Sequence, residues 1–191
     1  HLGPDIIDVD PVQVGRTVLS DLGIDIVIQD RYKMPGGLER TYTEELANAI
    51  FADEAPLYTD DRITVHRVPA PASPLPYVVL GPLNWGPLET PAAGHRQRVL
   101  TGLSATLQLY HASPQRQLSL RYHTLPGVAL QIRLMPDHLL ATLPPAPTGN
   151  VVTLDWSTVG IATPFSSPLE LELLPDQAHS VWVEQVALTT R

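Results

Sequence analysis

The chain of 191 residues contains no cysteine. That absence excludes a disulfide scaffold, thiolate metal ligands and a cysteine nucleophile. Charged residues are scarce, at 17% of the chain where about 25% is usual. The net charge of −8 implies no basic surface and so argues against nucleic acid as a partner. No apolar run approaches the roughly 20 residues that a membrane-spanning helix needs.

Proline, in contrast, is abundant at 20 residues, and four of them lie in Pro69–Pro76. Such a stretch favours an extended, semi-rigid backbone that suits a linker or an edge crossing. The acidity is concentrated in the first part of the chain: residues 1–80 carry 13 acidic and 6 basic side chains, against 7 and 6 in residues 81–191. We therefore expect a small subdomain over 1–68, a proline-rich linker or edge over 69–80 and a second domain over 81–191.

Residues 1–68 show strand and helix signals in alternation. The apolar residues of Ile6–Val9 predict a short strand. Asp10–Pro11 then offers a helix N-cap followed by proline at the first helical position, and Gly23 fits the end of that helix. Ile24–Ile28 is rich in β-branched residues and predicts a second strand.

The same alternation continues to the end of this segment. Thr41 and Glu44 fit a capping box that would begin a second helix. Leu57–Val68 is typical of a β-hairpin that turns at Asp60–Asp61. The order strand, helix, strand, helix and two strands predicts a small α/β unit.

Residues 81–191 carry only strand signals. The alternation slips by one residue at Glu184–Gln185, which predicts a β-bulge. About seven or eight short strands with this spacing predict an antiparallel β-sandwich, jelly-roll-like, and hence an α+β fold class for the whole chain. Apolar and polar residues alternate in five segments, separated by turns that contain proline or glycine: Leu107–Leu109, Leu118–Tyr122, Val128–Leu134, Leu169–Leu173 and Val181–Leu188.

Local catalytic motifs are absent from the sequence. No histidine belongs to an HExxH or HxH pattern and no serine to GxSxG, and His66 and His123 fit half-exposed positions on strands. The triplet Asp8–Asp10 has the form of a cation-binding DxD, but Asp10 is better explained as the helix cap. Asp60–Asp61 is better explained by a solvated turn. We therefore predict no catalytic residue, no metal site and no cofactor.

Carbohydrate binding is the one chemistry for which the sequence offers candidates. Sugars stack on exposed aromatic rings, and aromatic residues make up only 6% of this chain. We predict Trp85, Tyr110 and Trp156 as carbohydrate-binding residues. The alternative is that a Trp in a small sandwich lies in the core, with its N–H satisfied by a backbone acceptor. The complete set of platforms is Trp85, Tyr110, Tyr122, Trp156 and Trp182.

The segments LSDLGIDIVIQDRY and EAPLYTDDRITVHRV resemble the soluble tail of bacterial polytopic membrane glycosyltransferases of the GT-C type, related to arabinosyl- and mannosyltransferases. The resemblance runs from Leu22–Ile24 through Pro56–Asp61 and a Trp-Gly-Pro-x-Glu opening at Trp85–Glu89 to a last strand at Val181–Leu188. In that family the catalytic carboxylate lies near the first transmembrane helices, so the resemblance assigns no catalytic residue here. It implies a C-terminal extracytoplasmic domain whose partners are the transmembrane portion of the parent chain and an acceptor or lipid-linked sugar.

Three hypotheses on function follow. The first is a non-catalytic extracytoplasmic domain of a membrane glycosyltransferase-like protein, which agrees with the expectation that a chain beginning at His1 is a processed or excised product. The second is a carbohydrate-binding β-sandwich module. The third is a stand-alone hydrolase, in which Glu89 and Asp155 would pair as in glycosidases or a histidine would contact both an acid and a serine.

Overall fold

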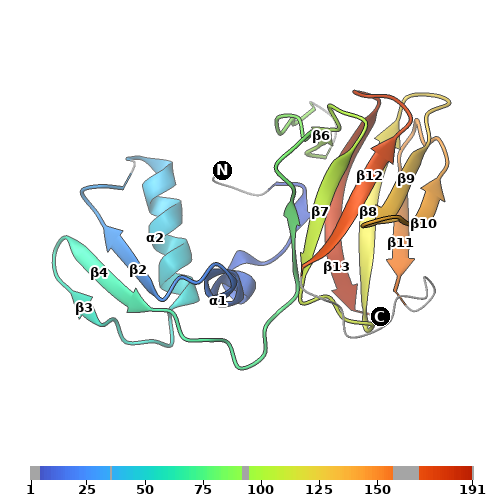
Figure 1. The fold of residues 1–191 in the computed structure, drawn as a ribbon. Coiled ribbons are helices and arrows are strands. Elements are labelled where there is room, and N and C mark those ends of the chain that lie inside the picture. The colour runs from blue at the N-terminus through green and yellow to red at the C-terminus, as the bar shows by residue number, and fades with distance from the viewer. Residues whose placement is uncertain (1–4, 35, 92–94, 157–167, 191) are drawn as a thin grey trace. The chain divides into compact units, whose positions relative to one another are not determined.

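The fold is α+β and divides into two compact units in this computed structural model, which describes residues 5–34, 36–91, 95–156 and 168–190. The N-terminal unit comprises Asp10–Leu75, and the sandwich unit comprises Pro4–Val9 with Pro76–Arg191. Each unit has its own sheets, as the ribbon in Figure 1 shows. Among the described residues, no helix is both long and apolar enough to cross a membrane.

The N-terminal unit contains two helices and one antiparallel sheet with the strand order β2-β4-β3. This confirms the predicted hairpin, because β3 and β4 pair on either side of the turn at Asp60–Asp61. The elements are α1 (Pro11–Asp21), β2 (Ile26–Asp30), α2 (Leu38–Ile50), β3 (Tyr58–Thr59) and β4 (Ile63–Arg67).

Local signals set the ends of the first helix but not of the second. The Asp10 carboxylate accepts a hydrogen bond from the Val12 amide at 2.9 Å, and Gly23 follows the helix with φ 67°, as predicted. The predicted capping box at Thr41–Glu44 is wrong, because α2 already begins at Leu38. Thr41 lies inside the first turn and donates from its hydroxyl to the carbonyl of Gly37, the residue before the helix.

The small sheet buries polar side chains and exposes apolar ones. Gln29, Thr64 and His66 are buried, and the His66 ring stacks on Phe51 at 4.6 Å just after the end of α2. Ile28, on the opposite face of β2, is 62% exposed. The expectation of a half-exposed His66 is therefore wrong, because its face of β4 is the covered one.

The sandwich unit holds two five-stranded sheets (Figure 1). One has the order β1-β13-β8-β11, with β6 also paired to β13, and the other the order β10-β9-β12-β7-β5. The strands are β1 (Ile7–Asp8), β5 (Tyr77–Leu80), β6 (Arg98–Val99), β7 (Ala105–Tyr110), β8 (Arg116–Thr124), β9 (Leu130–Leu134), β10 (His138–Leu143), β11 (Asn150–Asp155), β12 (Leu169–Pro175) and β13 (Val181–Thr190).

Two segments join the sandwich from outside the range 81–191. β1 pairs with β13 in parallel, and Ile6 beside it is only 1% exposed in the sandwich core. The first predicted strand is therefore not part of the N-terminal unit, and the sandwich is not wholly antiparallel. Tyr77–Leu80, assigned from the sequence to the linker, pairs with β7 because Val78 adds an apolar side chain to the core.

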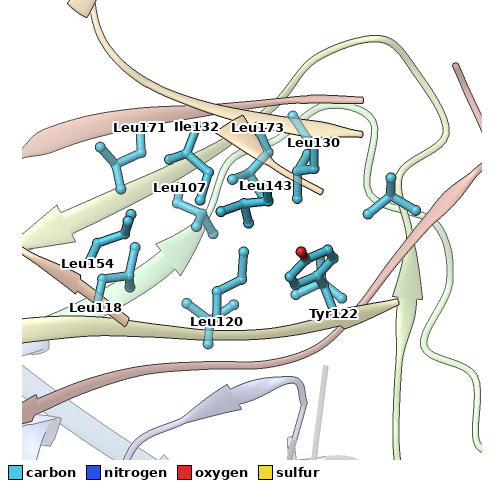
Figure 2. Close-up of a cluster of buried hydrophobic side chains, with 14 of the residues drawn as sticks. Leu107, Leu118, Leu120, Tyr122, Leu130, Ile132, Leu143, Leu154, Leu171 and Leu173 are labelled. Carbon is cyan, nitrogen blue, oxygen red and sulfur yellow. The ribbon is translucent and has the colours of Figure 1, made fainter. Parts of the chain in front are cut away.

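The core of the sandwich is formed by the inward residues of the alternating strands. In Figure 2, apolar side chains from one sheet face those from the other, and the Tyr122 hydroxyl lies among them. That hydroxyl donates to the Pro144 carbonyl at 3.1 Å. Each fully buried leucine contributes about 1.5–3 kcal/mol to folding. The facing sets are Leu107, Leu130, Ile132, Leu171 and Leu173 against Leu118, Leu120, Tyr122 and Leu154.

Candidate functional site

A β-bulge in β13 places two adjacent polar side chains on the outer face of the sandwich. The register of β13 against β8 shifts between Val183 and Gln185, which confirms the bulge predicted from the sequence. Val183 and Val186 are both 0% exposed and point into the core. Glu184 and Gln185 lie between these two valines in the chain, and both side chains are half-buried on the outer face of the sheet. The extra residue thus adds a polar group to a surface where strict alternation would supply only one.

Two hollows lie beside this bulge. One has a volume of about 480 Å³ and includes Asp5, Asp8 and Gln185 in its lining, and the other has about 450 Å³ and includes Thr148 and Asn150. We call the two hollows together the bulge groove. Three residues line both hollows and therefore join them: His95, Arg121 and Glu184.

Glu184 is held in place by a histidine on the neighbouring strand. His123 Nδ1 lies 2.8 Å from Glu184 Oε1, so Nδ1 carries the hydrogen and donates it to the carboxylate. The His123 ring is also stacked on Trp182, with ring centroids 5.0 Å apart and an angle of 6° between the planes. The stack fixes the imidazole, and the imidazole fixes the orientation of the carboxylate.

Arg121 has no carboxylate partner among the described residues. Its Nη1 lies 3.0 Å from His95 Nε2. Because a guanidinium can only donate, His95 Nε2 must accept and the imidazole is neutral in this contact. The Arg121 Nε is buried and, within the described part of the chain, has no hydrogen-bond acceptor. The groove thus contains a cation whose charge is not balanced by an ion pair.

The carboxylates at the other end of the groove already have partners. Asp5 receives two hydrogen bonds from Arg98, both of 2.8 Å, and one from the Ile6 amide. Burial raises the pKa of Asp5, but these hydrogen bonds outweigh burial and hold the pKa below its ordinary value. Asp5 is therefore ionised at neutral pH and is not a proton donor. Asp8 accepts a hydrogen bond of 2.7 Å from Gln185 Nε2.

The three predicted carbohydrate-binding residues do not share one surface. Trp156 is 1% exposed, so the expectation of an accessible ring there is corrected: it packs in the core. Trp85 is half-buried and donates from Nε1 to the Thr106 carbonyl at 3.1 Å. Tyr110 stacks on Tyr77, with centroids 4.7 Å apart. Thr106 and Tyr110 are four residues apart on β7, about 13 Å along the strand, so Trp85 and Tyr110 form no common platform.

The groups considered for catalysis have other partners. Glu89 accepts a hydrogen bond of 3.1 Å from Gln97, whereas Asp155 belongs to β11. His123 contacts the acid Glu184, but no serine hydrogen-bonds to it in the ranges that the structure describes. The two carboxylates of the DxD triplet have different partners, since Asp10 caps α1 and Asp8 accepts a hydrogen bond from Gln185. Over those same ranges, no three histidine or acidic side chains are grouped as metal ligands would be.

The sequence contained one signal for the bulge groove, the break in alternation at Glu184–Gln185. Arg121 and His123 occupy outward positions of β8, which the period-2 pattern of the strand identifies as facing away from the core. Nothing local indicates that His95, 26 positions from Arg121, lies against it. The residues of the groove were therefore missed because strand pairing, rather than spacing, brings them together.

No protein-family model matches the chain, and no curated protein is similar to it in sequence. Among solved structures it is similar to a family 6 carbohydrate-binding module (15% identity, 59% of this chain and 87% of that one, TM-score 0.39). It is also similar to the C-terminal family 6 module of LamC from Zobellia galactanivorans (10%, 60% and 91%, TM-score 0.38) and to a family 29 carbohydrate-binding module (12%, 57% and 79%, TM-score 0.35).

Proposed function

We propose that the sandwich unit is a non-catalytic carbohydrate-recognition domain and that the bulge groove is its binding site. The observation that carries the proposal is the set of planar polar side chains fixed around two adjoining hollows. Volumes of about 480 and 450 Å³ fall within the range of about 300–1,000 Å³ typical of small-molecule sites. Two such hollows with shared walls suit a ligand made of linked units.

The chemistry of the walls fits sugar hydroxyl groups, each of which both donates and accepts hydrogen bonds. Asp8 and Glu184 supply carboxylate acceptors, and Arg121 supplies donors. The acids are oriented beforehand by Gln185 and His123, so little side-chain freedom is lost when a ligand binds. Asp5 is fixed by Arg98 and stays ionised, which favours binding over proton transfer.

Calorimetric titration of the intact chain with a panel of neutral and acidic oligosaccharides tests this site. Q185A should raise the Kd for a bound saccharide at least tenfold, because it removes a wall side chain and releases Asp8. Q108A is the matched control, since Gln108 is an outward glutamine on β7 of the other sheet. Equal effects of Q185A and Q108A, or loss of binding only in W85A and Y110A, would place the site elsewhere.

We further propose that this chain belongs to a larger membrane protein. The sequence resemblance supports a membrane glycosyltransferase-like parent, with this chain on the extracytoplasmic face and the transmembrane portion as its partner. The saccharide would then be an acceptor or a lipid-linked sugar. The gene sequence upstream of His1 tests this: it should encode several apolar stretches of about 20 residues, and a gene without them contradicts the membrane parent while leaving carbohydrate recognition intact.

A further inference from the structure

We propose that Arg121 selects saccharides that carry an oxyanion, a carboxylate or a phosphoryl group, and that this group binds in the hollow lined by Arg121, Thr148 and Asn150. This inference rests on the proposed carbohydrate recognition and adds the ligand class. It concerns only that hollow, because in the described lining of the other one three carboxylates (Asp5, Asp8 and Glu184) outnumber the two guanidinium groups of Arg96 and Arg121.

The Arg121 guanidinium has no carboxylate partner among the described residues. Partly buried arginines are normally paired with acids, because an uncompensated charge away from water is costly. Arg121 contacts the neutral His95 imidazole instead, and its Nε is buried without an acceptor in the described part of the chain. An oxyanion in the hollow would supply the charge-balancing partner that a guanidinium fork recognises best.

The charges around the hollow leave Arg121 available to an oxyanion. Glu184 is the one carboxylate in the described lining of this hollow, and its Oε1 accepts a hydrogen bond from His123. Its orientation is therefore set by His123, and no ion pair forms between it and Arg121 among the described residues. The lining residues from Thr148 to Val151 carry no charge, and they include the polar Thr148 and Asn150 as well as the apolar Val151. Asn150 uses its Oδ1 to accept from the Val151 amide, which leaves its amide N–H groups as donors.

The Arg121 guanidinium lies where the two hollows adjoin. Arg121, His95 and Glu184 line both, so one sugar unit over the Asp8 and Gln185 side would place the acid group of a linked unit over Arg121. Hydroxyl groups would then meet the Asp5 and Asp8 carboxylates and Arg96 at one end, where acids are in excess, and the oxyanion would meet Arg121 at the other.

The test compares matched ligands on the intact chain by calorimetry. Galacturonosyl-galactose, a disaccharide with a single carboxylate, should bind with a Kd at least tenfold lower than that of galactobiose, its neutral counterpart. The R121Q variant should lose this preference, whereas R116Q, which changes an arginine five residues earlier on β8 and outside the groove, should keep it. Raising the salt concentration should shrink the preference in the unmodified chain, because screening weakens the charge contact.

Further arms separate the sources of the oxyanion. Comparing the Kd of galactose 1-phosphate with that of galactose tests the phosphoryl group. Tighter binding of the carboxylate-bearing or the phosphate-bearing sugar than of its neutral counterpart supports the proposal. Acetate and inorganic phosphate alone should bind at least tenfold more weakly than the acidic saccharides, and equal binding overturns the assignment to a sugar. R121K keeps the positive charge but lacks the planar guanidinium group, so it should retain only part of the preference. If thermal unfolding shows that R121Q does not fold, R121K replaces it in the test.

Besides equal binding of the free anions, three results overturn the inference. Equal affinity for acidic and neutral saccharides contradicts the role of Arg121 but not carbohydrate recognition. A preference for acidic saccharides that survives in R121Q has the same consequence. If no saccharide of either kind binds, both the inference and the proposed function fail.

Discussion

His123 Nδ1 and Glu184 Oε1 lie 2.8 Å apart, although 61 positions separate the two residues in the chain. Antiparallel pairing of β8 with β13 brings them together, and the β-bulge turns Glu184 outward so that it can meet the imidazole. The same bulge brings Gln185 to Asp8. One irregular residue in one strand therefore organises both ends of the bulge groove.

The contact between His123 and Glu184 should be measurable as an energetic coupling. The two side chains are 25% and 17% exposed, so we expect a double-mutant cycle with H123A and E184A to give a coupling of about 1 kcal/mol. Urea unfolding of the four proteins measures it, and the cycle is its own control. If the two single losses simply add, Glu184 is not held by His123.

Trp156 and Tyr110 should respond differently to truncation. W156A should lower the free energy of unfolding by about 3–5 kcal/mol, because it leaves a cavity in the sandwich core. Y110A should cost less, since it removes one half of a stacked pair on the outer face of the sheet. Denaturant unfolding compares the two variants, and a W156A variant of unchanged stability would contradict the core position of Trp156.

Asp30 should make the N-terminal unit sensitive to strong acid. Hydrogen bonds from Arg62, strengthened by its charge, lower the pKa of Asp30 to about 2 from an ordinary value of 3.8. A carboxyl with a depressed pKa stabilises the folded state fully above its unfolded pKa, and that contribution is lost as the pH falls from about 4 toward 2. Carbon-detected NMR titration of the Asp30 carboxyl measures the pKa directly. R62Q should move it back toward 3.8, and a titration near 3.8 in the unmodified chain refutes the pairing.

His66 should destabilise the N-terminal unit under mild acid. Burial lowers the pKa of His66 below its ordinary 6.5, so the folded state favours the neutral ring. The unfolded state then binds more protons, and stability is full above about pH 6.5 and declines as the pH falls below it.

The variant H66F separates this effect from other titrations. Phenylalanine keeps the stack on Phe51 and removes two buried ring nitrogens that have no hydrogen-bond partner among the described residues. We expect it to raise the free energy of unfolding by about 1 kcal/mol or more and to flatten the decline below pH 6.5. Thermal unfolding from pH 7.5 to 5 measures both, and parallel pH profiles for the two proteins would count against this role of His66.

The α+β class and much of the strand pattern follow from local physics. Asp10 and Gly23 define the ends of α1 because capping geometry depends on neighbouring residues alone. The bulge at Glu184–Gln185 is visible as a slip in alternation, since a strand buried on one face must keep its apolar residues on that face. The capping box at Thr41 failed because helix propensity in Leu38–Arg40 extended α2 by one turn beyond the local signal.

The amino-acid sequence by itself determined the α+β class, the presence of two helices, the inward residues of the alternating strands in the sandwich and the chemistries excluded by composition. The tertiary structure alone decided that β1 pairs with β13, that Trp156 lies in the core and that Arg121 meets His95. The physical reason is range: periodicity and capping act within a few residues, whereas a binding surface depends on which strands pair, and pairing is chosen by burial summed over the whole sandwich.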